Sequence, residues 1–456
     1  MARVAGVDSS TQSVKIVVRD SQSGALLAQA SRPHPDGTEV DPQHWWEALQ
    51  SVITEVGGLD SLDAISIAGQ QHGMVLLDSA GEVIRPALLW NDTRSAPQAI
   101  AINEAFPDIH LTTGSQLVAS FTASKVRWVL ENEPENAARI AAIALPHDWL
   151  SWKLSGSTNL ADLFTDRSDA SGTGYFNPAE NKYIPEILNW ISGNSDVVLP
   201  RIIAPGEVAA RVGKTVIAAG AGDNAGAALG IGATVGDLVI SLGTSGTAFA
   251  VSASATNDAS GEVAGFADAS GNYLPLACTL NAAKVFDATA KLLNVDFEKY
   301  SQLALEATPG SDGLMMMPHF DGERTPNRPN AHGAITGITH ASFTPANIAR
   351  ASIEGVIAGL AYATQALRKE GVQISRLLLV GGAARNKAVQ QIASEIFGMP
   401  VLTPTPGEYV SEGAAVQAAW ALDQRRPQWS DVEMEELSAP AQPAVLARYL
   451  SEIGSI

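Results

Sequence analysis

A short turn rich in hydroxyl groups, Asp8-Ser9-Ser10-Thr11-Gln12-Ser13, could bind phosphate. It joins an apolar strand to a second strand that contains Lys15, and successive backbone amides in such a turn form a concave anion site to which hydroxyl groups add donors. Asp8 could hold a hydrated Mg²⁺, directly or through water, because this ion prefers one or two carboxylates together with phosphate oxygens. An ordinary Asx-turn, with Asp8 bonded to its own backbone, is the alternative that this segment alone favours.

A second turn of the same kind, Gly243-Thr244-Ser245-Gly246-Thr247, lies in the other half of the chain. Its two glycines allow a phosphate group to approach the backbone closely. It is not a nucleotide-binding P-loop, because no Lys-Ser/Thr pair follows and the next expected element is a strand rather than a helix. Together with the first turn it predicts a phosphate clamp.

Asp223 is the candidate general base. It lies among tiny residues in Gly220-Ala221-Gly222-Asp223-Asn224-Ala225-Gly226, where an expected strand meets an expected helix. An aspartate at such a position usually caps the helix. The small neighbours would also let a substrate hydroxyl and a phosphoryl donor come within hydrogen-bond reach, and this slightly favours the base.

A third glycine-rich turn, Gly381-Gly382-Ala383-Ala384-Arg385-Asn386, follows the apolar strand Leu377 to Val380. A helix then runs to Gly398, and Pro400 lies just beyond it, as expected for a helix end. A glycine-rich turn between a strand and a helix can bind the phosphate or the base edge of a nucleotide. The turn lacks the spacing of the dinucleotide fingerprint, so NAD is not expected.

Polar side chains that could bind a polyol follow two expected strands. One group is Gln70-Gln71-His72, and the other is Trp90-Asn91-Asp92-Thr93-Arg94. An aromatic wall with amide, imidazole and guanidinium donors suits such a ligand, although a lone histidine is more often structural. No histidine pair has metal-ligand spacing and there is no Gly-x-Ser-x-Gly elbow, so zinc and serine hydrolase chemistry lack support.

The elements that must position these residues alternate between strand-like and helix-like patterns, which predicts an α/β protein. Val4 to Val18 and Leu238 to Val251 share one pattern, an apolar strand, a Gly/Ser/Thr turn and a second apolar strand. The two segments lie about half the chain apart, which predicts a duplication. We therefore expect two related domains, residues 1–232 and residues 233–456.

The composition excludes several classes of protein. Of 456 residues, 46% are hydrophobic and 17% are charged, as in globular chains. The net charge of −19 would repel nucleic acid and an anionic membrane. Asp8 interrupts the N-terminus before an apolar signal core could form, and the lone Cys278 excludes an intramolecular disulfide. We expect a cytoplasmic protein that binds neither nucleic acid nor a membrane.

The motifs together resemble the FGGY family of carbohydrate kinases, over nearly the whole chain. Each motif is short, and all of them occur in the family's order. They are DSSTQSVK at 8–15, GQQHG at 69–73, WNDTR at 90–94, HDWLSWKLSG at 147–156, GAGDNAG at 220–226, SLGTSGT at 241–247, GERTP at 322–326, GGAARN at 381–386 and EGAAVQAA at 412–419. Two departures are that Ser10 stands where many relatives have glycine, and that the chain is somewhat short.

The resemblance implies two duplicated actin-like, ribonuclease-H-like ATPase domains with an active-site cleft between them. The sugar would lie on the side of residues 1–232, and the nucleotide on the side of residues 233–456. A homodimer is one assembly that the resemblance leaves open. ATP and Mg²⁺ are the implied cofactors. The implied ATP contacts are Ser10, Thr11, Lys15, Gly243, Thr244, Gly381, Gly382, Ala383 and Asn386.

The implied catalytic residues are Asp223, as general base, and Asp8, near the metal and the phosphates. The implied sugar contacts are Gln71, His72, Trp90, Arg94, Asp223 and Asn224. GQQHG favours the members of the family that phosphorylate D-xylulose to D-xylulose 5-phosphate. Ribulose, fuculose, gluconate or glycerol is the alternative acceptor. A nucleotide-dependent binding or chaperone-like protein is a further alternative, which GQQHG and WNDTR oppose because such proteins need no sugar donors.

Overall fold

The chain forms two compact units in a computed structural model that describes residues 2–430 and 432–453. Unit 1 comprises Met1–Ala233, Gly265–Leu274 and Gly407–Asp431, and unit 2 comprises Thr234–Ala264, Pro275–Pro406 and Val432–Ile456. The observed division differs from the one expected at 232/233 in two later segments, 265–274 and 407–431, which belong to unit 1. Segment 407–431 packs with unit 1 because it carries α14 (Tyr409–Asp423), a helix of small residues that lies against the first strand of the chain.

The main sheet of unit 1 has the order β3-β2-β1-β5-β14-β13. Along this order the neighbouring strands are antiparallel, antiparallel, parallel, parallel and antiparallel. A short additional strand, β15, pairs with the end of β5. These strands are β1 (Arg3–Ser9), β2 (Ser13–Asp20), β3 (Leu26–Pro33), β5 (Ala64–Gly69), β13 (Val208–Val212), β14 (Thr215–Ala218) and β15 (Ala221–Gly222).

The sheet of unit 2 repeats this pattern in β19-β17-β16-β22-β23-β24, with the same sequence of strand directions. The two hairpins noted in the sequence, β1–β2 and β16–β17, hold the same place in the two sheets, which confirms the expected duplication. The strands are β16 (Asp237–Leu242), β17 (Gly246–Ala250), β19 (Tyr273–Thr279), β22 (Arg376–Val380), β23 (Val401–Pro404) and β24 (Met434–Leu437).

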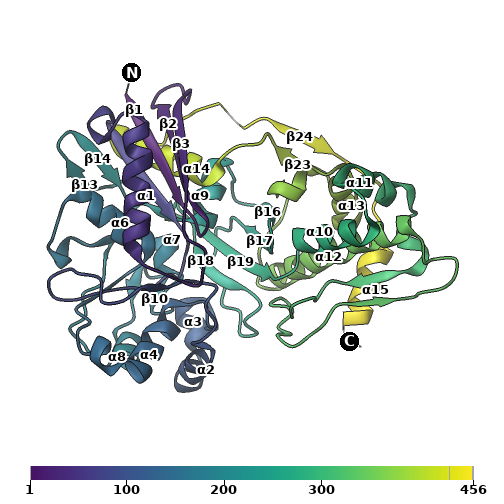
Figure 1. The fold of residues 1–456 in the computed structure, drawn as a ribbon, viewed down its shortest axis with the longest axis horizontal. Helices are drawn as coiled ribbons and strands as arrows, with labels where there is room; N and C mark the ends of the chain where they lie inside the picture. Colours follow the sequence, from purple (N-terminus) through teal and green to yellow (C-terminus); the bar gives the residue numbers. More distant parts are fainter. Residues whose placement is uncertain (1, 431, 454–456) are drawn as a thin grey trace. The chain divides into compact units, whose positions relative to one another are not determined.

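Helices cover both faces of the unit 1 sheet (Figure 1). On one face, α1 (Pro42–Glu55) begins where the Asp41 side chain accepts a hydrogen bond from Gln43 N, and it buries Trp45 against the strands. On the other face lie α14 and α9 (Asp223–Gly230). These two helices approach so closely that a Cβ at Gly413 would collide with the backbone of α9, so the small residues form a packing seam.

The core of unit 2 surrounds α12 (Pro345–Lys369), which is buried along most of its length. No described helix combines the length and the apolar character that a membrane span requires. The remaining helices are α2 (Ala96–Ala105), α3 (Ile109–Thr113), α4 (Thr122–Asn132), α5 (Pro134–Ala137), α6 (Pro146–Ser155), α7 (Arg167–Ala170), α8 (Pro185–Ser192), α10 (Ala283–Leu293), α11 (Phe297–Glu306), α13 (Lys387–Phe397) and α15 (Pro443–Ile453), with 3₁₀ turns at Leu59–Ser61, Leu160–Asp162, Ser311–Gly313 and Gly382–Arg385.

One further strand, β18 (Ala264–Ala267), pairs with β19. The remaining strands are short and form two-stranded sheets. The pairs are β4 (Glu39–Val40) with β7 (Ala87–Leu88), β6 (Val75–Leu77) with β8 (Ala142–Ala144), β9 (Phe164–Asp166) with β12 (Arg201–Ile203), β10 (Phe176–Asn177) with β11 (Lys182–Tyr183), and β20 (Met315–Met317) with β21 (Ala334–Thr336).

Candidate active site

Three strand ends of unit 1 meet at one edge of the sheet. In the parallel pairing of β1 with β5, Asp8 lies opposite Ala68, and in the pairing of β15 with β5, Ala221 lies opposite the same residue. The chain leaves β5 into Gln70 and leaves β15 into Asp223, the first residue of α9. The register therefore brings the predicted base, the predicted metal ligand and the GQQHG segment to the same edge.

Asp223 retains some contact with solvent but lies deep enough for its ionisation to be disfavoured. Burial raises the pKa of this carboxyl to about 7, and the nearby carboxylate of Asp8 acts in the same direction. Asn224 opposes the shift, because its backbone N and its Nδ2 donate to Asp223 Oδ1 at 2.7 and 2.9 Å. A carboxyl with a pKa near neutrality can exchange a proton with a substrate hydroxyl.

Asp8 is buried beside the first turn. Burial raises its pKa to about 6, although the Ser10 hydroxyl, which donates to Asp8 Oδ1, and the positive charge of Lys15 both lower it. The negative charges of Glu408 and Asp8 oppose the ionisation of Asp8 and Asp223 respectively, and a divalent cation would offset this cost. The oxygen donors present here fit the chemistry of Mg²⁺, with Asp8 as the residue that would hold it.

The first turn is tied to the predicted sugar segment by side chains. Trp90 Nε1 donates to Thr11 Oγ1 at 2.9 Å, and Thr11 Oγ1 in turn donates to Gln70 Oε1 at 3.3 Å. Lys15, on β2 opposite Asp8, pairs with Glu408 across 2.6 Å. Thr11 and Trp90 thus link the predicted phosphate turn to the GQQHG segment.

Gln71 and His72 are held by the turn that contains α7. Gln71 Nε2 donates to Ser168 O at 3.1 Å, and His72 Nδ1 lies 2.6 Å from Gly172 O. The His72 ring packs beside two aromatic rings that also contact each other, with centroids 4.9 Å from Phe121 and 5.7 Å from Phe266. An amide and an imidazole beside an aromatic wall form a surface that suits a polyol.

Arg94 makes contacts that do not support its predicted role. Its guanidinium pairs with Asp92 at 2.9 Å and with Glu39 at 2.8 Å, and it lies over the ring of Trp128. These partners satisfy the charge of Arg94 within its own part of unit 1. The sugar contact predicted for Arg94 therefore stays a prediction without support from the geometry.

Unit 2 contains a cavity of about 620 Å³ at the ends of two neighbouring strands. The parallel register places Ser241 of β16 opposite Val380 of β22, so the turns that follow these strands lie together. Five of the predicted ATP contacts line the cavity, namely Gly243, Thr244, Gly382, Ala383 and Asn386. Gly381, directly before Gly382, has a φ of +96°, and a Cβ there would meet the carbonyl oxygen of Leu242 at 2.5 Å.

Asn386 has a structural role whether or not a ligand is present. It caps α13, because its side chain accepts hydrogen bonds from Ala388 N and Val389 N. Its Oδ1 also accepts from Ser301 Oγ at 2.8 Å. The cap satisfies two amides at the N-terminus of α13, directly after the turn that lines the cavity.

Several lining residues carried no signal in the sequence. The cavity wall includes Phe286 of α10 and Phe297 and Tyr300 of α11. These residues lie on amphipathic helices and resemble ordinary core positions in the sequence, although Phe297 is 53% exposed in the structure. An exposed phenylalanine beside glycine-rich turns suits a heteroaromatic ring such as a nucleobase. In unit 1, Ser168 and Gly172 likewise carried no signal in the sequence for their contacts with Gln71 and His72.

Comparison with known proteins gives consistent matches over almost the entire chain. Residues 3–240 match the N-terminal domain, and residues 238–422 the C-terminal domain, of the FGGY family of carbohydrate kinases. The chain is 43% identical to the xylulose kinase of Streptomyces coelicolor, over 92% of this chain and 88% of the other, and 41% identical to that of Streptomyces rubiginosus, over 97% and 92%. It is also similar to the crystal structure of xylulose kinase from Bifidobacterium adolescentis, with a TM-score of 0.93, 43% identity and 99% of each chain covered.

Proposed function

Because the chain belongs to the FGGY family of carbohydrate kinases, we propose that it transfers the γ-phosphoryl group of ATP to the terminal 5-hydroxyl of D-xylulose. The products are D-xylulose 5-phosphate and ADP. One geometric observation carries the proposal, namely the convergence of Asp8, Gln71 and Asp223 at a single sheet edge. The choice of xylulose rests on the relatives of that name.

The reaction depends on placing a hydroxyl between a base and a phosphoryl donor. Asp223 accepts the proton of the 5-hydroxyl, and Gln71 and His72 hold the sugar. The backbone amides of the first turn and of Gly243–Thr244 bind the phosphates. Asp8 would hold Mg²⁺, directly or through water, and the bound ion would supply positive charge that offsets the phosphates. That all these groups border one crevice between two domains stays a prediction.

A panel of acceptors tests the proposal. ADP release is measured with D-xylulose, D-ribulose, L-fuculose, gluconate and glycerol, and the position of the new phosphate is read by NMR. We expect kcat/KM for D-xylulose to exceed that of every other acceptor by at least about tenfold. A faster reaction with another polyol would assign a different sugar. ATP turnover that no acceptor stimulates would instead indicate a binding or chaperone-like protein.

The pH dependence of the reaction follows from Asp223. Its pKa is raised to about 7, so the carboxyl is protonated below that pH and cannot accept a proton. We expect kcat/KM for the sugar, at saturating ATP, to fall about tenfold per pH unit below that value and to level off above it. A profile that is flat from pH 5.5 to 8, roughly the range in which such a base titrates, would contradict the assigned base.

Filling the cavity of unit 2 should weaken nucleotide binding selectively. Ala383 lines the cavity, so Ala383→Trp places an indole where the nucleotide would lie. We expect the KM for ATP to rise at least about tenfold while the KM for the sugar stays unchanged. Ala138→Trp, at an exposed alanine of unit 1, is the matched control and should change neither constant. An unchanged KM for ATP in Ala383→Trp would place the nucleotide elsewhere.

A further inference from the structure

A histidine buried among three aspartates lies behind the sugar segment. His147, at the start of α6, has no exposed surface, and neither has Asp169. His147 Nδ1 lies 2.6 Å from Asp169 Oδ2 and 3.2 Å from Asp148 Oδ1, and His147 Nε2 lies 4.0 Å from Asp166 Oδ1. The proposed reaction uses none of these four side chains directly, so their concentration of charge needs another explanation.

The contact between His147 and Asp169 is a hydrogen-bonded ion pair. A separation of 2.6 Å is typical of a charge-assisted hydrogen bond and leaves no room for a metal ion between the two atoms. Burial lowers the pKa of His147, but the carboxylates of Asp148, Asp169 and Asp166 outweigh it and raise the pKa to about 10. The imidazole is therefore a cation at neutral pH, and it neutralises part of the buried acidic cluster.

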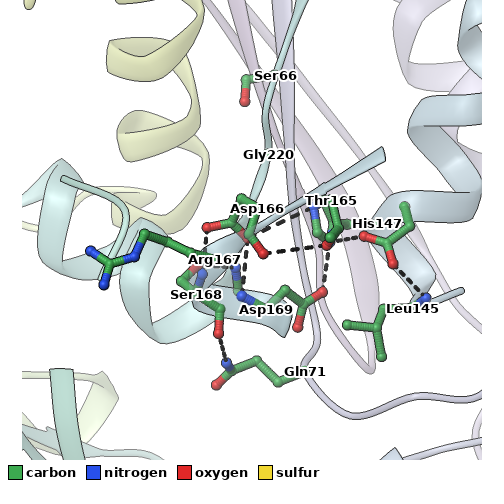
Figure 2. A network of polar contacts seen from close by, with 12 residues as sticks. Ser66, Gln71, Leu145, His147, Thr165, Asp166, Arg167, Ser168, Asp169 and Gly220 are labelled. Atoms are coloured by element: carbon green, nitrogen blue, oxygen red, sulfur yellow. Dashed lines mark hydrogen bonds and ion pairs between the residues drawn. The ribbon is translucent and has the colours of Figure 1, made fainter. Parts of the chain in front are cut away.

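The turn that carries Asp169 also holds Gln71, one of the candidate sugar residues (Figure 2). Asp166 caps α7 by accepting from the backbone N of Ser168 and of Asp169 at 2.7 and 3.0 Å. Ser168 O accepts from Gln71 Nε2, and Ser168 Oγ accepts from the backbone N of Gly222 at 3.0 Å. Gly222 directly precedes the candidate base. One short turn thus contacts both the sugar segment and the strand end that presents the base.

The same turn reaches the second member of the sugar pair. The backbone N of Gly172 donates to Asp169 O at 2.8 Å, and Gly172 O contacts His72 Nδ1 at 2.6 Å. His147 therefore holds, through Asp169, the peptide groups that position the His72 ring.

The other side of the His147 ring fits against the strands. Gly220, with φ +87°, lies so close to the ring that any Cβ there would collide with it. Gln417 fixes this glycine, because it accepts from Gly220 N at 2.9 Å and donates to Gly220 O at 2.8 Å. Ser66 Oγ donates to Gln417 Oε1 at 2.6 Å. The imidazole is thus clamped between the strand ends and the turn at residues 166–172.

We infer that His147 and Asp169 are positioning residues for the sugar, because their buried ion pair sets the distance between the strand ends and the turn that orients Gln71, His72 and Gly222. Neither residue touches the substrate. The pair acts on unit 1, so it governs the sugar and the base and leaves the nucleotide cavity of unit 2 unaffected. This inference rests on the proposed function.

The test compares steady-state constants of His147→Ala, His147→Asn and Asp169→Asn, with whichever acceptor the wild type phosphorylates fastest. In His147→Ala we expect the KM for the sugar to rise and kcat to fall, each at least about tenfold, with an unchanged KM for ATP. His147→Asn keeps a donor near the position of Nδ1 and should recover most of the sugar KM. Asp169→Asn keeps an acceptor and should resemble His147→Asn.

Two further variants keep the test decisive if His147→Ala does not fold. Ser168→Ala removes only the hydroxyl that accepts from Gly222 N, and we expect a lower kcat with an intact fold. Glu395→Gln breaks another buried ion pair, with Arg350 in unit 2, and it should lower the melting temperature without changing the sugar KM.

Two outcomes would overturn the inference. One is that the His147 and Asp169 variants melt earlier but keep wild-type constants. The other is that they change the KM for ATP as much as that for the sugar. A wild type that phosphorylates a polyol other than xylulose would instead refute the proposed substrate and leave this test valid.

Discussion

Asp223→Asn is expected to lower kcat at least ~100-fold while the KM for the sugar stays within about threefold of the wild-type value. Asparagine has nearly the same shape as aspartate and can still accept the backbone hydrogen bond of Asn224 that Asp223 Oδ1 accepts at 2.7 Å. It therefore keeps the start of α9 intact but cannot take the proton of the substrate hydroxyl. Steady-state kinetics at pH 8, above the raised pKa of about 7, measures both constants.

The same variant separates the base from a helix cap through its stability. Because the pKa of Asp223 rises from 3.8 to about 7 on folding, the stability contributed by its protonated form is lost as the pH rises from about 4 to about 7, and the loss is complete at pH 8. Removing that charge should leave the melting temperature at pH 8 unchanged or higher. Asp41→Asn, at the N-cap of α1, is the matched control and should keep full activity. Near-normal turnover in Asp223→Asn would show that this carboxyl is not the base.

The local patterns of the sequence were sufficient for the parts of the fold that are built from neighbouring residues. The hairpins at Val4 to Val18 and Leu238 to Val251 were predictable because apolar strands flank a turn of small polar residues. The junction at Asp223 was predictable for a related reason, since a strand followed by tiny residues and a helical pattern leaves the aspartate at the strand end. In both cases neighbouring residues determine the geometry.

Contacts between distant segments were not predictable in this way. The small residues Gly413-Ala414-Ala415 indicate a helix that packs closely against another element, but they do not specify which one. In the structure this helix packs against α9 and β1. Phe297 of the unit 2 cavity resembles an ordinary core residue in sequence, and the motif that begins at His147 does not indicate that this histidine pairs with Asp169. Their roles depend on which segments the sheets bring beside them.

The repeated sheet explains why chemistry occurs at corresponding places in the two units. In each, a hairpin turn follows the first strand and a second loop follows its parallel neighbour, so two loops meet at one edge. The unit 1 edge carries carboxylates, amides and an imidazole, whereas the unit 2 edge carries glycines beside aromatic side chains. One ancestral arrangement thus supplies loops that can be specialised separately for a sugar and for a nucleotide.

His72→Ala is expected to lower kcat/KM for the sugar at least ~100-fold, mainly by raising KM, because a lost ligand hydrogen bond and a collapsed aromatic wall together weaken binding by about 3 kcal/mol. The imidazole is oriented by Gly172 O and packs against Phe121 and Phe266, so its removal opens the wall as well as deleting a polar group. The KM for ATP should not change, since the cavity proposed for the nucleotide is lined by residues of unit 2.

The backbone at His72 supplies a conservative variant. Its φ of +70° lies in the left-handed region, which asparagine adopts more readily than most residues, and an asparagine amide can still donate to a nearby carbonyl. His72→Asn should therefore fold like the wild type and retain part of the sugar affinity that His72→Ala loses. His110→Ala, at a histidine on α3 that contacts Gln116, should leave every constant unchanged. If His72→Ala kept the wild-type KM for the sugar, the polyol would have to bind away from the GQQHG segment.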